Sequence, residues 1–271
     1  MQTISSRRNP IVSEYRRAAR AGAGGGPLLL DGAHLIADAE AAGLLIRSAA
    51  VVAARLAASA EMDRLVRRLD GRGVPVFTVP APVMAAMSPV RTPSGMVALA
   101  DRPEGRLARA LEGARPLVAA AVDVQDPGNL GAIVRAAEAA GATGLIACGR
   151  SADPYGWKAL RGAMGSAFRL PIAAAVAVPD ALAALRARGI RVCAAVPGRG
   201  ESIYAAPLDG PVAILLGGEG AGLPAEVVAQ ADVRLHIPMQ PPVESLNVAV
   251  AAALFLFEAA RQRAGIPHVV R

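Results

Sequence analysis

The chain has 271 residues, 54% of them hydrophobic, and its 29 Lys and Arg against 22 Asp and Glu give a formal net charge of +7. This composition excludes a disordered chain and is enough for one or two globular domains. Arginine carries nearly all the positive charge, because Lys158 is the only lysine. Its planar fork matches phosphate oxygens and favours a polyanionic partner, although a GC-rich genome would also replace lysine by arginine.

Several features bear on where the protein works. The arginine-rich first twenty residues are not followed by an apolar signal segment, because charged residues between Asp31 and Glu40 interrupt the next run. No apolar run is long enough to cross a membrane. Cys148 and Cys193 have no second cysteine nearby to make a metal or redox motif, so both are predicted to be reduced and buried. We therefore expect a cytoplasmic protein with no membrane or metal partner.

The chain opens with a basic segment, residues 7–22, that has the pattern of an amphipathic helix. Ile11, Tyr15 and Ala18 recur at helical spacing and are predicted to face a core. Three arginines of the same helix would look outward: Arg16, Arg17 and Arg20. An ordinary solvated face explains them, and so does a surface that binds phosphate.

Strand-like and helical patterns alternate through the first hundred residues, which predicts a small α/β unit. The successive runs are residues 27–32, 33–43, 44–52, 61–73, 74–79, 81–88 and 96–100. Between Asp101 and Pro116 the pattern loses strand character and mixes Pro, Gly and charge, as in a linker with room for one helix. We place the boundary there, with a first domain of residues 1–105 and a second of residues 106–271.

The second domain again alternates strands with helices. Strands are predicted at residues 116–124, 143–149, 170–176, 190–196, 212–218 and 233–239, and helices from residue 130, at 179–189, at 224–231 and from about 244 to 263. Such alternation predicts an α/β fold with a mostly parallel sheet covered on both faces. Ligands bind such sheets at the carboxyl ends of the strands, so three loops that follow strands should share one edge: residues 125–131, 217–224 and 238–247.

The first of these loops opens a helix. Asp126 and Pro127 suit a turn, and Asn129 is predicted to cap a helix that begins at Leu130. Arg135 would lie on the flank of that helix. It either forms an exposed i,i+3 pair with the glutamate three residues later, at position 138, or serves the loop edge as a functional group.

The other two loops are less informative when taken singly. The second packs glycines around Glu219, but Leu223 occupies the place of the last glycine of a dinucleotide fingerprint, and no Walker lysine follows. The third puts Glu244 and Ser245 at the start of an apolar helix as start signals. Asn247 within the first turn of that helix is unexpected, because asparagine competes with the helical backbone.

Together the loops match one family. The segments "DVQDPGNLGAIVRAAEAAG", "SADPYGWKALRGAMGSAFRLPI", "LLGGEGAGL" and "IPMQPPVESLNVAVAAALFLFE" resemble, in order, the SpoU group of SPOUT RNA ribose 2'-O-methyltransferases over residues 115–263. The first domain resembles the ribosomal-L30e-like substrate-binding unit of such enzymes through "SSRRNPIV", "LLLDGAHLI" and "SPVRTPSGMVAL".

The resemblance implies a C-terminal trefoil knot, S-adenosylmethionine as cofactor, a homodimer and an RNA substrate, ribosomal RNA rather than transfer RNA. The implied cofactor-binding residues are Leu216, Gly217, Gly218, Ile237, Met239 and Leu246. The implied active-site residues are Asn129, Arg135, Glu219, Ser245 and Asn247. The chain departs from the family at Pro241, where glycine is usual and cofactor affinity could change, and at Ala163, where serine is common.

The chemistry implied by the resemblance suggests a division of labour. Arg135 would bind the phosphate beside the target ribose and stabilise alkoxide character, since arginine is an improbable proton acceptor. Asn129 and Asn247 would orient groups by hydrogen bonds, and Ser245 or solvent would relay the proton. Three alternatives stay open: a transfer RNA 2'-O-methyltransferase, a catalytically silent RNA-binding protein of the same fold, and a Rossmann dehydrogenase.

Overall fold

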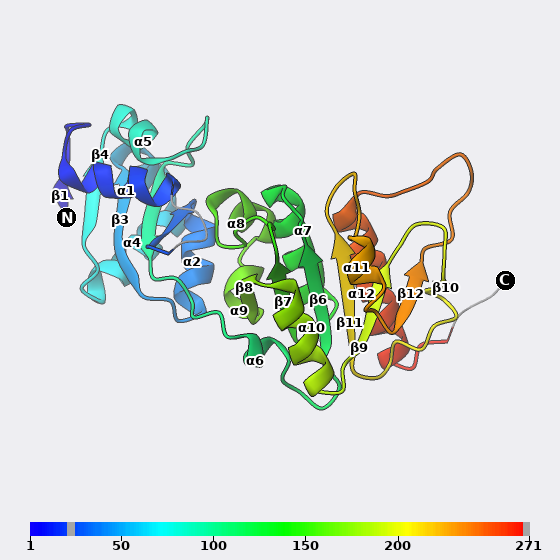
Figure 1. Ribbon diagram of the computed structural model, residues 1–271. Helices are drawn as coiled ribbons and strands as arrows, with labels where there is room; N and C mark the ends of the chain where they lie inside the picture. The colour runs from blue at the N-terminus through cyan, green and yellow to red at the C-terminus, as the bar shows by residue number, and fades with distance from the viewer. Residues whose placement is uncertain (21–24, 268–271) are drawn as a thin grey trace. The chain divides into compact units, whose positions relative to one another are not determined.

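The computed structural model describes residues 1–20 and 25–267, which form two compact units (Figure 1). The first unit comprises the described residues between Met1 and Glu104, together with the segment Tyr155–Arg161. The second unit comprises the other described residues. The predicted linker contains one short helix, α6 (Leu107–Ala110).

The first unit is built on a five-stranded mixed sheet in the order β1-β4-β3-β5-β2. Strand β5 pairs antiparallel with both β2 and β3, whereas β4 pairs parallel with β1 and β3. The strands are β1 (Gln2–Thr3), β2 (Leu28–Asp31), β3 (Ile46–Val52), β4 (Val76–Val79) and β5 (Met96–Ala100). The helices are α1 (Pro10–Arg20), α2 (Ala33–Ala41), α3 (Ala53–Ala58), α4 (Ala60–Gly71) and α5 (Ala81–Met87).

Helix α1 packs with α5 over one apolar face of this sheet. Its buried residues are Val12, Tyr15 and Ala18. Ile11 is partly buried and packs against the same core, so all three predicted residues face it, and Val12 widens the apolar face by one residue that was not predicted.

The second unit is built on a seven-stranded sheet in the order β10-β12-β9-β11-β6-β7-β8, and all of its pairs are parallel (Figure 1). The strands are β6 (Leu117–Val122), β7 (Gly144–Cys148), β8 (Ile172–Val176), β9 (Arg191–Ala195), β10 (Glu201–Ser202), β11 (Val212–Gly217) and β12 (Val233–His236). The helices of this unit after α6 are α7 (Pro127–Ala139), α9 (Ser166–Arg169), α10 (Val178–Ala187), α11 (Ala225–Val228) and α12 (Val248–Arg263). Helix α8 (Trp157–Ala163) lies mostly in the segment assigned to the first unit.

Helices cover both faces of this sheet, as the alternating pattern predicts. Helices α6, α10 and α11 contribute to the core on one face, and α7 packs against α12 and the strands β6 and β7 on the other. Central strands are buried along their length, so they read as unbroken apolar runs. Because all the strands run in the same direction, the loops after β6, β11 and β12 lie at one edge, which confirms the prediction that they share it.

Both cysteines are buried free thiols, as predicted. Burial raises the pKa of Cys148 and of Cys193 to about 12 in each case, because the thiolate would lose its hydration. Among the described residues, no helix is long and apolar enough to span a membrane.

Candidate functional site

The loop after β6 presents Asn129 differently from the prediction. Helix α7 begins at Pro127, and Asp126 is its N-cap, with the carboxylate Oδ1 accepting the Asn129 N–H at 2.8 Å. The predicted cap at Asn129 and start at Leu130 are therefore wrong. Aspartate caps as well as asparagine, and proline suits the first helical position, which moves the start three residues earlier. As a result, the Asn129 side chain is free to face the neighbouring loops.

The loop after β12 ends at a second cap. Helix α12 begins at Val248, and the Asn247 Oδ1 accepts the N–H groups of Ala249 at 2.9 Å and Val250 at 3.4 Å. The predicted start at about residue 244 is four residues too early. The position of Asn247 outside the helix removes the conflict with asparagine's low helical preference.

Three side chains from the three loops form one hydrogen-bonded group, which we call the polar trio: Asn247, Asn129 and Glu219. The Asn247 Nδ2 donates to the Asn129 Oδ1 at 3.0 Å, and the Asn129 Nδ2 donates to the Glu219 Oε1 at 2.6 Å. The bonded residues are 118 and 90 positions apart in the sequence, and the parallel sheet brings them together because its loops share one edge. The structure therefore brings together three of the five predicted active-site residues.

A cavity of about 510 Å³ lies between the same loops. It is lined by all six predicted cofactor-binding residues: Leu216, Gly217, Gly218, Ile237, Met239 and Leu246. Glu219, Ser245 and Asn247 also line it, so the polar trio borders the cavity. The segment Ala195–Pro197, which follows β9, forms a further part of the wall. This segment was not predicted among the loops of the site, although Gly198, Arg199 and Gly200 follow it directly.

The glycine-rich loop is shaped by contacts of the chain with itself. A Cβ added at Gly217 would lie 2.2 Å from the Gly222 carbonyl carbon, and one at Gly218 would lie 2.2 Å from the Asp123 carbonyl oxygen. Both glycines are thus required where backbone approaches backbone. Their absent side chains let the β11 loop close on itself and against the residue that follows β6.

Arg135 lies apart from the polar trio. Its predicted pairing with Glu138 is wrong, because Glu138 accepts from the Arg169 Nη2 at 2.9 Å, and this hydrogen bond lowers the pKa of the Glu138 carboxyl. Arg135 is exposed on α7 and makes no hydrogen bond or ion pair with another described residue. Its guanidinium is therefore available to an external anion.

The remaining predicted positions lie in or near the third loop. Ser245 lines the cavity but makes no hydrogen bond with the polar trio. Pro241, where the family pattern has glycine, is followed by a cis peptide bond to Pro242, and neither proline lines the cavity. Ala163, the other departure, is fully buried at the end of α8.

Comparison with known proteins gives consistent similarities. A profile of the SpoU rRNA Methylase family matches residues 116–257. An uncharacterised tRNA/rRNA methyltransferase of Synechocystis sp. is 32% identical over 96% of this chain and 94% of its own length. The 23S rRNA (guanosine(2553)-2'-O)-methyltransferase RlmP of Bacillus subtilis is 29% identical over 95% of this chain and 98% of its own length.

Solved structures extend the similarity to the fold. The rRNA methyltransferase from Sinorhizobium meliloti, determined with bound AdoMet (S-adenosylmethionine), has a TM-score of 0.82 at 29% identity and covers 100% of this chain and 99% of its own. The whole-chain matches span both units, whereas the family profile begins only at residue 116 and leaves out residues 1–104 of the first unit.

Proposed function

This chain belongs to the SpoU rRNA methylase family, and from that premise we propose that it transfers a methyl group from S-adenosylmethionine to a ribose 2'-hydroxyl of ribosomal RNA. The observation that carries the proposal is the polar trio at the border of the cavity. It puts unpaired polar atoms beside a site large enough for a cofactor. Two relatives named for 23S rRNA favour ribosomal RNA over transfer RNA as the substrate.

The cavity fits the cofactor in size and chemistry. Its volume of about 510 Å³ lies within the range of roughly 300–1,000 Å³ that small-molecule sites occupy. Leu216, Ile237, Met239 and Leu246 offer apolar surface to the adenosine and methionine carbons, and the backbone at Gly217 and Gly218 offers polar groups. When bound, the cofactor supplies an electrophilic methyl group on a sulfonium sulfur. The protein's own residues orient the hydroxyl and manage its proton.

We assign Arg135 to a phosphate of the RNA near the target ribose. Arg135 follows Asn129 by six positions, which on a helix is about one and two-thirds turns and about 9 Å along the axis. That separation suits a contact with the nucleotide backbone while Asn129 faces the reacting group. A phosphate held by the arginine fork would fix the ribose, and the positive charge would stabilise developing alkoxide. Asn129 and Asn247 would orient the ribose through their spare amide N–H groups.

We assign substrate binding to the first unit, as an L30e-like RNA-binding domain of residues 1–105. The support is the outward face of α1, where Arg16, Arg17 and Arg20 are exposed and make no hydrogen bond or ion pair with another described residue. Together with Ser13 they line one hollow in the surface. Arginines that the protein itself does not neutralise are suited to RNA phosphates, and a ribosomal RNA substrate would place the protein in the cytoplasm.

We also propose the homodimer and the trefoil knot expected of the family. Helix α12 exposes an apolar stripe of Val250, Leu254 and Phe257, whose exposed fractions are 51%, 39% and 51%. Their spacing of four and three residues puts them on one face, which a second copy of the chain would bury. Because Asn247 caps the same helix, the dimer interface would lie close to the catalytic edge. The knot is proposed from the family resemblance.

Binding and transfer separate this proposal from its alternatives. Calorimetry should detect S-adenosylmethionine and its demethylated product, whereas absence of heat at millimolar ligand would contradict the cofactor assignment. With methyl-labelled cofactor, label should enter ribosomal RNA. Label in transfer RNA alone would establish the other substrate class, and cofactor binding without label in any RNA would establish a catalytically silent RNA-binding protein.

A further inference from the structure

Methylation of a ribose hydroxyl requires a group that receives the hydroxyl proton. The candidates near the cavity border are the two amides of the polar trio, the hydroxyl of Ser245 and the carboxylate of Glu219. Neutral amides have no basic site for this purpose, and a serine hydroxyl is as weak an acid and base as the substrate hydroxyl. The guanidinium of Arg135 carries only hydrogen-bond donors and no acceptor. The carboxylate is the one base among these groups.

The hydrogen bonds within the polar trio have a single direction. The Asn247 Oδ1 faces the N–H groups that open α12, so its Nδ2 must face Asn129. The Asn129 Oδ1 accepts that bond, so its Nδ2 must face Glu219. Each amide is therefore oriented by its neighbour, beginning at the positive end of a helix dipole. The last acceptor of the series is the Glu219 Oε1.

The second carboxylate oxygen of Glu219 has no partner among the described residues. Glu219 also lines the cavity. None of the ion pairs between described residues involves Glu219, so a neutral amide orients the carboxylate. An arginine partner in that place would have weakened the carboxylate as a base by stabilising its ionised form.

We propose, as a deepening of the proposed methyltransferase function, that Glu219 is the catalytic base and that Asn129 and Asn247 are positioning residues for it. The O–H bond of the ribose breaks with its proton passing to the Glu219 Oε2, and the oxygen electron pair forms the new bond to the methyl carbon. The electron pair of the broken carbon–sulfur bond stays on sulfur. The carboxylate and the sulfonium are thereby both neutralised, and Glu219 then returns its proton to solvent.

The substitution Glu219→Gln tests this assignment, because glutamine keeps the shape and an oxygen that accepts from Asn129 but has no basic oxygen. We expect single-turnover methyl transfer to fall by about 10²–10⁴-fold, the usual contribution of a general base. Calorimetric affinity for S-adenosylhomocysteine and the thermal midpoint should stay close to wild type. The matched control is Glu226→Gln on α11, an exposed glutamate of the same unit, which should leave all three quantities unchanged.

Three outcomes would overturn the assignment. If Glu219→Gln transfers methyl groups at a near-normal rate while Glu219→Ala does not, Glu219 only positions Asn129. If Glu219→Gln loses cofactor affinity and rate by the same factor, it shapes the cavity. If the wild-type protein binds cofactor and RNA but methylates none, the proposed function itself fails, and that result is distinct from a failure of the variant alone.

Discussion

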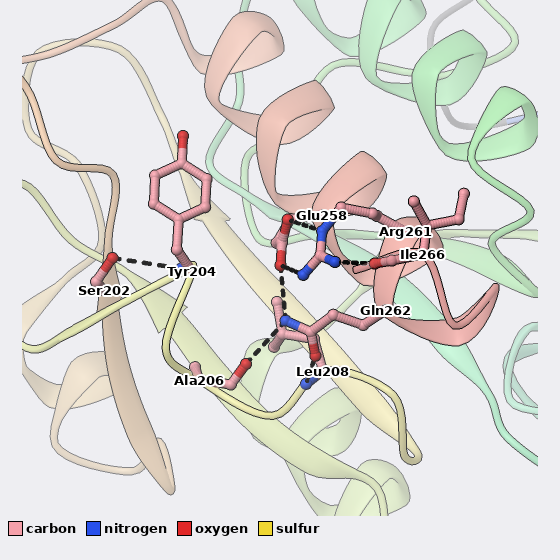
Figure 2. Close-up of polar contacts among 8 residues, drawn as sticks. All are labelled: Ser202, Tyr204, Ala206, Leu208, Glu258, Arg261, Gln262 and Ile266. Atoms are coloured by element: carbon pink, nitrogen blue, oxygen red, sulfur yellow. Dashed lines mark hydrogen bonds and ion pairs between the residues drawn. The ribbon is translucent and has the colours of Figure 1, made fainter. Parts of the chain in front are cut away.

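The two ends of helix α12 are both polar, but they use their polar groups in opposite ways. At the C-terminal end, Arg261 and Gln262 both donate to Glu258, and Gln262 also binds the backbone of the segment before β11 (Figure 2). At the N-terminal end, Asn247 belongs to the polar trio, which is bonded only in part. The two ends differ in how many of their hydrogen-bond donors and acceptors are used within the protein.

The C-terminal end is a closed network. The Gln262 Oε1 accepts the Leu208 N–H at 2.7 Å, and its Nε2 donates to the Ala206 carbonyl at 3.0 Å and to the Glu258 Oε1 at 2.8 Å (Figure 2). The Arg261 Nη2 donates to the same Glu258 oxygen at 2.7 Å. Gln262 attaches the helix to the loop before β11, and Glu258 holds both Gln262 and Arg261 in place.

The N-terminal end leaves capacity unused. After the bonds inside the polar trio, Asn247 and Asn129 each keep an amide hydrogen, and the Glu219 Oε2 accepts nothing from the described residues. Asn129 is half-buried, and Asn247 and Glu219 are exposed, so their spare donors and acceptor face solvent beside the cavity, where a ligand can replace water. The candidate site therefore differs from the scaffold by its hydrogen-bond donors and acceptors that have no partner among the described residues, more than by the number of its polar residues.

Beside the loss expected for Glu219→Gln, the next largest effect on methyl transfer is expected at Arg135, whose guanidinium makes no bond with another described residue. Arg135→Ala should lower single-turnover methyl transfer by about a hundredfold or more, as when a preorganised stabilising group is removed. Cofactor affinity should change little, because the cavity does not include this residue. Arg135→Lys should also be impaired, since an ammonium group cannot reproduce the fork.

The matched control for Arg135 is Arg188→Ala. Arg188 is exposed at the C-terminal end of α10, at the opposite edge of the sheet. The Arg188→Ala variant should transfer methyl groups at the wild-type rate. Near-normal transfer by Arg135→Ala would remove that residue from the site.

A substitution in the network at the C-terminal end of α12 should lower the stability of the protein and leave the rate of methyl transfer unchanged. Gln262→Ala removes the partner of the buried Leu208 N–H and is expected to lower the free energy of unfolding by about 2 kcal/mol. Urea denaturation measures this loss. Gln230→Ala, whose side chain makes only an exposed bond to the Glu226 carbonyl, should cost under about 0.5 kcal/mol. Equal costs for the two variants would break the distinction between the two ends.

In the first unit, the arginines of α1 that have no partner among the described residues should contribute to RNA affinity, with a smaller effect than the substitutions at the site. Arg16→Ala/Arg17→Ala should weaken RNA binding by about tenfold and reduce the salt slope by roughly 2, one for each lost phosphate contact. The control is Arg64→Ala/Arg67→Ala on α4, where Arg67 pairs with Asp63 at 2.9 Å. An identical loss in both double variants, measured by filter binding across salt concentrations, would show only a general effect of charge.

The site could be predicted from the sequence because topology determines it. Parallel strands that alternate with helices must deliver their following loops to one edge, so the pattern of the chain alone groups residues 90 and 118 positions apart. The cavity lining was predicted through the family resemblance and includes all six of those residues. The two-residue strands β1 and β10 were missed, because such short pairings leave no periodic pattern.

The predictions were wrong where two residues compete for the same role or for the same partner. Asp126 and Asn129 are both good caps, and only the structure shows which one is used. The i,i+3 pairing of Arg135 with Glu138 failed because Arg169, 31 residues further along the chain than Glu138, makes a better-placed ion pair. Helical spacing cannot reveal such a tertiary competitor.

Nucleoside mass spectrometry of unmodified ribosomal RNA, after incubation with the protein and S-adenosylmethionine, tests most directly whether the protein methylates a ribose hydroxyl. We expect a 2'-O-methylated nucleoside whose formation depends on Arg135 and Glu219. A base-methylated nucleoside, or no methylated nucleoside from protein that demonstrably binds cofactor and RNA, would contradict this expectation.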